Sequence, residues 1–320
     1  MSEERKALLI GGSGFIGKSL AVALANRGWR ITIPSRRPYR HRDLLVHPRI
    51  QLLEANVINP EALHSLCKGH HLVVNLIGIL HEQRKDDFRR YHVDFIKTLV
   101  DACIDNGIGR LLHLSALGAD QGTGSSRYLR SKGEGENLLH TFGQRSLQVT
   151  SFKPSGVFGK DDDFINRFAG LLKWFVGYFP LACPDSKLSP VYVGDLVERI
   201  IDSIDDPESY AKRLEICGPE VLTLRQIIEL IIENLKLPVR VLPLGKSMSQ
   251  LQAIVLQNLP GKLFTLDNFR SLQTDNICTG GQPCTTSLRQ YLRGLSVLFG
   301  KKRHYDQFRK KLSQRPRDHL

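Results

Sequence analysis

The chain has 320 residues, which at roughly 150 residues per domain predicts about two domains. Its apolar content of 41% and charged content of 24% exclude a disordered chain and a coiled coil, and six cysteines are too few for a disulfide-stapled module. The formal net charge of +13 indicates an anionic partner or a solvated basic segment, and says little about the fold.

Two features of the sequence bear on its compartment. No stretch of about 18 or more uncharged apolar residues occurs, so the sequence predicts no transmembrane helix. The N-terminal segment begins with acidic residues and has only a short apolar run, unlike a secretory signal. We therefore expect a cytoplasmic protein in a reducing compartment, with its six cysteines as free thiols. The basic character leaves open a peripheral position at the inner face of the membrane.

The first 160 residues alternate between short apolar runs and longer helical patterns, which is typical of βαβ units and a parallel sheet. The run at 72–77 (LVVNLI) is continuously apolar, as expected for a strand that is covered on both faces. Predicted strands occupy residues 7–10, 30–34, 50–54, 72–77, 110–114 and 147–152, and predicted helices occupy residues 15–26, 92–106 and 128–140. The pattern predicts a doubly wound parallel α/β sheet.

The pattern changes after Gly159. Aromatic side chains are concentrated at residues 164–181, helical periodicity occurs at 193–204 and 224–235, and a strand pattern occurs at 213–217. We therefore predict a cofactor-binding domain at 1–160, to which segments near 190–218 return, a smaller C-terminal α+β substrate lobe at 161–300, and a basic tail at 301–320.

A glycine motif lies at the predicted junction of the first strand and the first helix. Gly11, Gly14 and Gly17 form Gly-x-x-Gly-x-x-Gly. Glycine permits the tight turn, lets a pyrophosphate approach the backbone, and lets helix and strand pack closely, while the helix N-terminus offers free N–H groups to phosphate. We expect the loop and the first helical turn to bind a dinucleotide through Gly11, Ser13, Gly14, Phe15, Ile16 and Gly17. A purely structural turn is the alternative.

The residues after the second predicted strand indicate which dinucleotide binds. An NAD-selective site has an Asp or Glu there, which accepts a hydrogen bond from the ribose 2′-OH. In the segment RITIPSRRPYRHR no acidic residue occurs before Asp43, and Arg36 and Arg37 occupy the place of an adenosine 2′-phosphate. A guanidinium binds phosphate through two hydrogen bonds and stacks on adenine. The segment favours NADP(H) over NAD(H), and a basic surface loop is the alternative.

Tyr128 and Lys132 are spaced i, i+4, so a helix places both on one face. Together with Ser115 they follow the strand that ends near Leu114, at the edge where open α/β sheets bind ligands. An ammonium about 4 Å from the phenol would lower the Tyr128 pKa by about three units, toward neutral pH. We predict that Tyr128 is the general acid/base, Lys132 its electrostatic partner and ribose anchor, and Ser115 the group that binds a substrate hydroxyl.

These segments together resemble a known superfamily. GGSGFIG, VVNLIG, YLRSKGEGE, KPSGVFG and PVYVGDLVERI resemble motifs of the extended or atypical short-chain dehydrogenases/reductases, the NAD-dependent epimerase/dehydratase superfamily, which has a Rossmann-type fold. GPEVLTLRQII and SLQTDNI are similar to segments of one group within it, that of the NADPH-binding accessory subunit of respiratory complex I, which also includes proteins linked to ubiquinone biosynthesis. The resemblance spans residues 7–276. It implies that Asn75 and Gly78 line the cofactor groove, and that Pro154, Val157 and the residues between them face the nicotinamide.

The resemblance leaves two functions open. The first is an NADP(H)-dependent oxidoreductase or epimerase/dehydratase that acts on a carbinol or carbonyl substrate, including a quinone-related one. The second is a non-catalytic NADPH-holding accessory or assembly factor of a respiratory or quinone-synthesis complex. In the family the catalytic Ser or Thr precedes a short aromatic–glycine stretch, whereas Ser115 begins SALGAD, so the role of Ser115 also stays open.

Two segments bear on partners. The aromatic segment 164–181 either forms the core of the small lobe or contacts an apolar substrate or a membrane surface. The basic tail either solvates the chain or contacts anionic lipid, a partner complex or nucleic acid, although no recognised nucleic-acid-binding motif occurs. Neither Cys-x-x-Cys nor His-Glu-x-x-His occurs, so we predict no metal.

Overall fold

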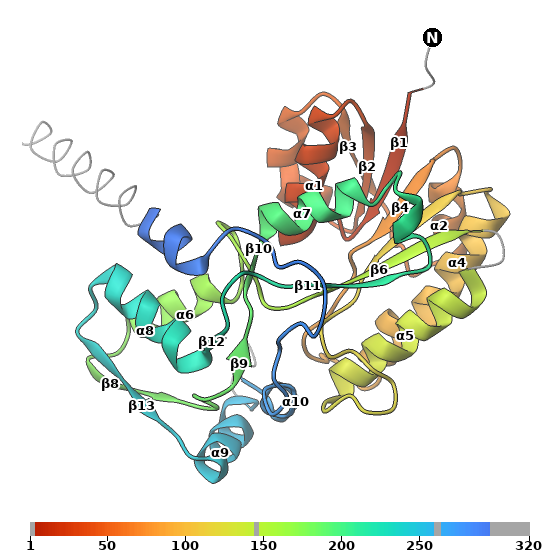
Figure 1. Ribbon diagram of the computed structural model, residues 1–320. Helices are drawn as coiled ribbons and strands as arrows, with labels where there is room; N and C mark the ends of the chain where they lie inside the picture. The colour runs from red at the N-terminus through yellow and green to blue at the C-terminus, as the bar shows by residue number, and fades with distance from the viewer. Residues whose placement is uncertain (1–3, 144–146, 259–263, 295–320) are drawn as a thin grey trace, which may run out of the picture.

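Seven parallel strands form the central sheet (Figure 1). The computed structural model describes residues 4–143, 147–258 and 264–294, so the predicted tail at 301–320 lies outside the described residues. The sheet has the order β11-β6-β5-β4-β1-β2-β3, and every neighbouring pair is parallel. The strands are β1 (Lys6–Ile10), β2 (Arg30–Ser35), β3 (Ile50–Glu54), β4 (Leu72–Asn75), β5 (Arg110–Leu114), β6 (Gln148–Pro154) and β11 (Arg213–Ile216). The doubly wound parallel sheet predicted from the sequence is confirmed.

Helices cover both faces of the sheet (Figure 1). On one face lie α1 (Phe15–Asn26) and α7 (Val193–Asp202), and on the other lie α2 (Pro60–Cys67), α4 (Phe95–Asp105) and α5 (Arg127–Gly143). Successive strand side chains point to opposite faces, so Leu9 of β1 packs into the α1–α7 core and Leu8 into the core under α2 and α4. This two-sided burial is the reason for the continuous apolar runs.

The winding of the sheet reverses between β1 and β4. Strands β2 and β3 extend the sheet on one side of β1, and β4, β5 and β6 extend it on the other. The loops that leave the carboxyl ends of β1 and β4 therefore diverge and leave a crevice between them. In open α/β sheets this crevice is the usual ligand site.

The small lobe follows β6 and has its own core. Its elements are β7 (Val157–Phe158), α6 (Ile165–Leu172), β8 (Gly177–Leu181), β9 (Lys187–Leu188), β10 (Val191–Tyr192), β12 (Leu222–Thr223), α8 (Leu224–Leu235), β13 (Val239–Pro243), α9 (Lys246–Leu256) and α10 (Leu266–Ser271). The short helix η3 (Pro207–Ser209) packs instead on the central sheet, where Ser209 accepts hydrogen bonds from Arg110 and Thr150. The apolar side of α8 packs against α6, β8 and β13. The aromatic segment 164–181 is divided, because Phe164, Phe168 and Phe179 pack in this core while Trp174 and Tyr178 are exposed.

Several elements differ from the sequence prediction, among them β4 and the helices before and after it. The strand predicted at 72–77 ends at Asn75, because the Asn75 side-chain oxygen accepts a hydrogen bond from the Ile77 N–H and turns the chain. The helix predicted at 92–106 begins earlier, as α3 (Asp87–Arg89) and the π-helical turn η2 (Arg90–Asp94), before it continues as α4. Helix α2 was not predicted, although Asn59 caps its first turn.

The prediction that all six cysteines are thiols is wrong for one pair. Cys217 and Cys278 form a disulfide, while Cys67, Cys103, Cys183 and Cys284 are free and buried. The two half-cystines are 61 residues apart, so no local spacing reveals the pair. They meet because the chain leaves the small lobe after α10 and passes over the end of β11.

None of the helices in the described part of the chain has the length and apolar character needed to cross a bilayer. Within the same residues, no group of three or more His, Cys, Asp or Glu side chains could hold a metal ion.

Candidate functional site

A cavity of about 950 Å³ opens at the carboxyl ends of β1, β2, β3 and β4, a volume typical of small-molecule and cofactor sites. It lies at the crevice that the reversal of the sheet creates. Its lining comes from four loops and includes Gly11, Ser13, Gly14, Arg36, Arg37, Arg40, His41, Asn56, Val57, Ile58, Gly78, Ile79, His81 and Tyr91. Six of the cofactor residues predicted from the sequence therefore lie together.

The glycine loop meets the demands of a phosphate site. Gly11 has a φ of +81°, in the left-handed region that side chains avoid. A Cβ on Gly17 would lie 2.5 Å from the Gly12 Cα, so the start of α1 packs directly on the loop. Gly14 is the N-cap of α1 and has no side chain to satisfy the first N–H groups of the helix. These donors and the helix dipole suit an anion.

Three predicted cofactor residues form the first turn of α1, directly after this loop. Phe15, Ile16 and Gly17 belong to α1 and do not line the cavity. The Phe15 ring lies beside Gly159, where a Cβ would approach it to 3.1 Å, and Ile16 packs on the core under α7. The packing of these residues positions the loop, and their backbone N–H groups are the free donors at the start of α1.

Basic side chains surround the cavity where β2 ends. Arg36 and Arg37 line it and are exposed, and Arg40 and His41 of η1 (Pro38–Val46), which the sequence reasoning missed, line it as well. The nearest acidic residue in sequence, Asp43, is bound by the Lys18 ammonium at 2.7 Å, which lowers the pKa of that carboxyl. Among the described residues, no acidic side chain pairs with Arg36 or Arg37.

The turn after β3 also faces the cavity. Asn56, Val57 and Ile58 line it directly after the strand ends at Glu54. None of these residues was predicted from the sequence, although they directly follow a strand at the edge where open α/β sheets bind ligands. They add an apolar wall beside the arginine cluster.

Tyr128 and Lys132 lie on the first turns of α5, as predicted, but outside the lining of the cavity. The Tyr128 ring packs edge-on against His92, with centroids 5.7 Å apart, and is tilted against Phe88. Gly78 links the two regions, because a Cβ on it would face both the cavity and the Lys132 Nζ, at 3.8 Å from the latter. The pair therefore lies at one end of the cavity.

The protonation of the pair differs from the sequence expectation. The Lys132 ammonium donates to the backbone oxygens of Leu114, at 2.6 Å, and Ile77, at 3.4 Å. Burial lowers the pKa of Lys132 to about 8, although the Glu136 carboxylate opposes this, and burial raises the pKa of Tyr128 to about 12. In this arrangement the phenol holds its proton at neutral pH, rather than titrating near neutral pH as the sequence led us to expect.

The structure does not bring Ser115 to the cavity. Its side chain is buried and donates to a carboxylate oxygen of Glu136, which is itself fully buried on α5. The other Glu136 oxygen lies 3.3 Å from the Arg213 Nε. A sequence pattern cannot reveal this link between β5, α5 and β11, because it joins residues far apart in the chain.

Asn75 stabilises the turn at the end of β4 through its side chain. It is buried, its amide donates to the His113 Nδ1 at 3.1 Å, and its oxygen accepts from the Ile77 N–H. Burial lowers the pKa of His113 well below its usual value, so the imidazole is neutral and accepts this bond. Asn75 supports the turn that carries Gly78, and does not itself line the cavity.

Pro154 and Val157 flank a turn at the end of β6 and also lie outside the cavity lining. The Pro154 carbonyl accepts from the Leu117 N–H, and Val157 pairs with Val191 in the β7–β10 ribbon. Between them, the Ser155 hydroxyl donates to Asn276.

The fold and the cavity define a dinucleotide-binding protein of the doubly wound α/β class. The family model described as the NAD dependent epimerase/dehydratase family matches residues 7–201, and the chain belongs to this family. The resemblance seen in the sequence is thereby confirmed.

The chain is 29% identical over 231 residues to NADH dehydrogenase (ubiquinone) 1 alpha subcomplex subunit 9, mitochondrial, of Mus musculus. The matched residues cover 70% of this chain and 60% of that protein. The chain is 25% identical over 198 residues to a ceramide reductase of Caulobacter vibrioides, which covers 60% of this chain and 59% of that protein. It thus spans about three fifths of these relatives. The solved structure of the epimerase Mth375 from Methanothermobacter thermautotrophicus has the same fold, with a TM-score of 0.70 at 16% identity over 96% of this chain and 95% of that one.

Proposed function

We propose that the protein binds NADP(H) in the crevice, with the diphosphate on the glycine loop and the adenosine 2′-phosphate among the arginines after β2. The observation that carries this proposal is the group Arg36, Arg37 and Arg40, which faces the cavity while the nearby Asp43 carboxylate is paired with Lys18. A phosphate there would receive charge-assisted hydrogen bonds, which contribute about 1.5–3 kcal/mol each.

The R36A/R37A double variant tests the cofactor. We expect NADPH affinity to fall about 100-fold, since two charge-assisted bonds are lost, and NADH affinity to change little. Arg42→Ala is the matched control, because Arg42 is exposed on the same segment and does not line the cavity. Equal losses for the two coenzymes would overturn the assignment of the 2′-phosphate.

We further propose that the protein is a reductase of a carbonyl substrate. The bound coenzyme would supply a hydride to the carbonyl carbon. Tyr128, whose phenol is protonated at neutral pH, would donate its proton to the oxygen, and Lys132 would hold the coenzyme ribose next to it. The similarity to a ceramide reductase supports reduction over epimerisation.

Tyr128→Phe separates this proposal from a purely accessory role. The variant keeps the ring contacts with His92 and Phe88 and loses only the proton donor. A reductase loses its turnover in this variant and keeps its NADPH affinity. A protein that only holds the coenzyme in a respiratory or quinone-synthesis complex, as the similarity to a complex I subunit suggests, supports that complex equally well with either residue.

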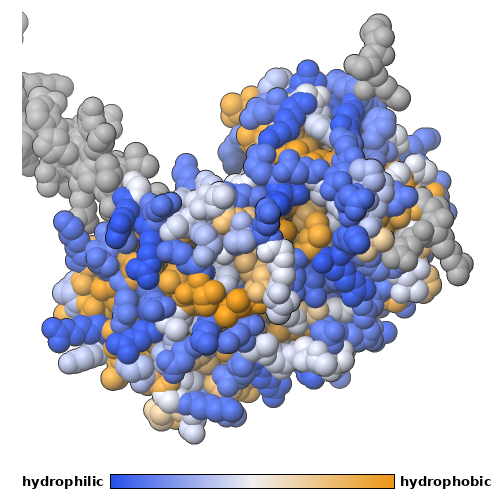
Figure 2. Space-filling model, in the orientation of Figure 1, coloured by the Kyte–Doolittle hydropathy of each residue, from blue (hydrophilic) through white to orange (hydrophobic). Residues whose placement is uncertain are grey.

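The small lobe favours a peripheral position on an anionic membrane. Trp174 and Val176 are 88% and 85% exposed beside Tyr178, and Leu251 and Val255 are exposed on one side of α9. Neither residues 164–184 nor residues 234–258 contain Asp or Glu, while together they carry five Lys or Arg. We call the exposed surface of these two segments the β8–α9 face. Figure 2 shows hydrophobic residues at the surface of the small lobe.

Apolar and aromatic side chains among basic ones are typical of surfaces that bind an anionic bilayer interface. We propose that the β8–α9 face binds such a membrane. Flotation with vesicles of phosphatidylcholine, with and without phosphatidylglycerol, tests this. The W174S/L251S variant should lose binding to the anionic vesicles, whereas Val22→Ser, an exposed change on α1, should retain it. Equal flotation of all three proteins would refute the proposal.

A further inference from the structure

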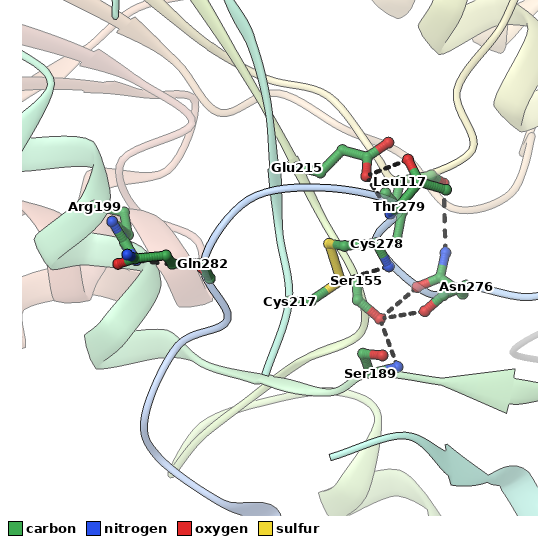
Figure 3. The surroundings of a disulfide bond; sticks show 10 residues. All are labelled: Leu117, Ser155, Ser189, Arg199, Glu215, Cys217, Asn276, Cys278, Thr279 and Gln282. Atoms are coloured by element: carbon green, nitrogen blue, oxygen red, sulfur yellow. Dashed lines mark hydrogen bonds between the residues drawn. A yellow bond between two sulfur atoms is a disulfide. The ribbon is translucent and has the colours of Figure 1, made fainter. Parts of the chain in front are cut away.

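The disulfide fastens a segment that crosses the end of the sheet (Figure 3). We call residues 274–284, which follow α10, the strap. Cys217 directly follows β11 and is 5% exposed, whereas Cys278, in the strap, is only partly buried. The Cys278 N–H also donates to the Cys217 sulfur at 3.1 Å. Cys278 is therefore the more exposed half of the disulfide.

The strap touches the turn that the family resemblance assigns to the nicotinamide. The Ser155 hydroxyl donates to the side-chain oxygen of Asn276 at 2.5 Å and to its backbone oxygen at 3.0 Å. The Asn276 amide in turn donates to the Leu117 carbonyl, in the loop that follows β5 (Figure 3). Asn276 lies two residues from Cys278, so the covalent anchor is next to these contacts.

Beyond Cys278, the end of the strap is held by Cys284, which is buried and whose N–H donates to the Cys217 carbonyl at 2.8 Å, and the residues between them are held by hydrogen bonds at the surface. Thr279 donates to the Glu215 carboxylate, and the Arg199 guanidinium donates to the Gln282 carbonyl at 3.3 Å. Exposed hydrogen bonds of this kind contribute little, because water replaces them. Between the anchored residues Asn276 and Cys284, the disulfide is thus the main restraint on the strap.

We propose that Cys217–Cys278 is a thiol–disulfide exchange site through which a cellular dithiol reductant releases the strap and loosens the 154–157 turn, so that the reduced protein binds NADP(H) more weakly. The coupling to the coenzyme rests on the proposed function above. Release of the strap does not.

A thiolate of the dithiol attacks the sulfur of the more exposed Cys278 and forms a mixed disulfide, and Cys217 leaves as a thiolate that takes a proton. The second thiol of the reductant then attacks the reductant sulfur that is bonded to Cys278, and Cys278 leaves as a thiolate that takes a proton. Two electrons and two protons pass to the protein, and the reductant becomes a disulfide.

The full chain tests the site in its oxidised and dithiothreitol-reduced forms. After denaturation, maleimide labelling should count four thiols in the oxidised protein and six in the reduced one. Pepsin fragments that contain the strap should exchange amide hydrogens about tenfold faster after reduction. NADPH should bind about fivefold more weakly to the reduced protein, because part of its binding energy then reorders the turn.

Two variants complete the test. C217S/C278S should behave like the reduced protein whether or not dithiothreitol is present, and Cys284→Ser, which removes a buried free thiol of the same strap, should respond like the wild type. Six thiols in the oxidised protein, or a strap whose exchange ignores reduction, would overturn the site. Equal NADPH affinity of both forms would overturn the coupling. Failure of both forms to bind NADPH would overturn the proposed function, while hydrogen exchange would still decide whether the strap opens.

Discussion

Lys132 should destabilise the folded protein at neutral pH, because its ammonium is buried. Burial lowers its pKa from 10.5 to about 8. At about 1.4 kcal/mol per pKa unit, this corresponds to roughly 3 kcal/mol that the charge costs the native state below pH 8. Between pH 8 and pH 10.5 the unfolded state binds more protons at Lys132 than the native state does. The contribution of Lys132 to the free energy of unfolding therefore becomes less unfavourable as the pH rises.

Lys132→Met removes the charge and also leaves the Leu114 and Ile77 carbonyls without its hydrogen bonds. The second effect is the same at all pH values, so a comparison of two pH values isolates the charge. At pH 10 the unfolded Lys132 is still mostly charged, so part of the cost remains. The unfolding free energy of the variant relative to the wild type should therefore be about 2.5 kcal/mol higher at pH 7 than at pH 10.

Urea unfolding of both proteins at pH 7 and pH 10 measures this difference. Lys97→Met, at an exposed position of α4, is the matched control and should show no such change. A difference between Lys132→Met and the wild type that stays constant with pH would refute the conclusion that the ammonium is buried at this position.

Two further predictions concern the scaffold. Arg110→Met should lower the free energy of unfolding in urea by about 3–5 kcal/mol, because the buried guanidinium donates to five oxygens that join β5, β6 and the segment after α7. Arg130→Met, at an exposed position, should change it by less than about 0.5 kcal/mol. Equal effects of the two substitutions would refute this prediction. Gly17→Ala should abolish NADPH binding measured by fluorescence, because the new Cβ would clash with Gly12. Gly170→Ala should bind NADPH like the wild type, because the space around Gly170 is open. Normal NADPH binding by the Gly17 variant would contradict the loop geometry.

The sheet and its main helices could be predicted because their signals are local. The apolar runs of the strands and the periodicity of α1, α5 and α8 report burial within a few residues of themselves. Helix α2 was not predicted because it is short. Its signals, a capping Asn59 followed by Pro60, precede only two turns of helix. The earlier start of this helix, at α3, was not predicted because the π-helical turn at 90–94 interrupts the helical periodicity of the sequence.

The site was predictable only where one loop carries it. The glycine loop and the arginines after β2 were found because each occupies a fixed place after a strand. Arg40 belongs to the same basic segment, but only the fold of η1 turns it toward the cavity. The Ser115–Glu136 bond, the Lys18–Asp43 pair and the disulfide join distant parts of the chain, so no local pattern contains them.

Calorimetric titration of the full chain with NADPH, and separately with NADH, tests the central claim most directly. The account predicts one site per chain, with NADPH bound at least tenfold more tightly than NADH, since only NADPH carries a phosphate for the arginines. No heat of binding with either coenzyme at millimolar concentration would contradict it.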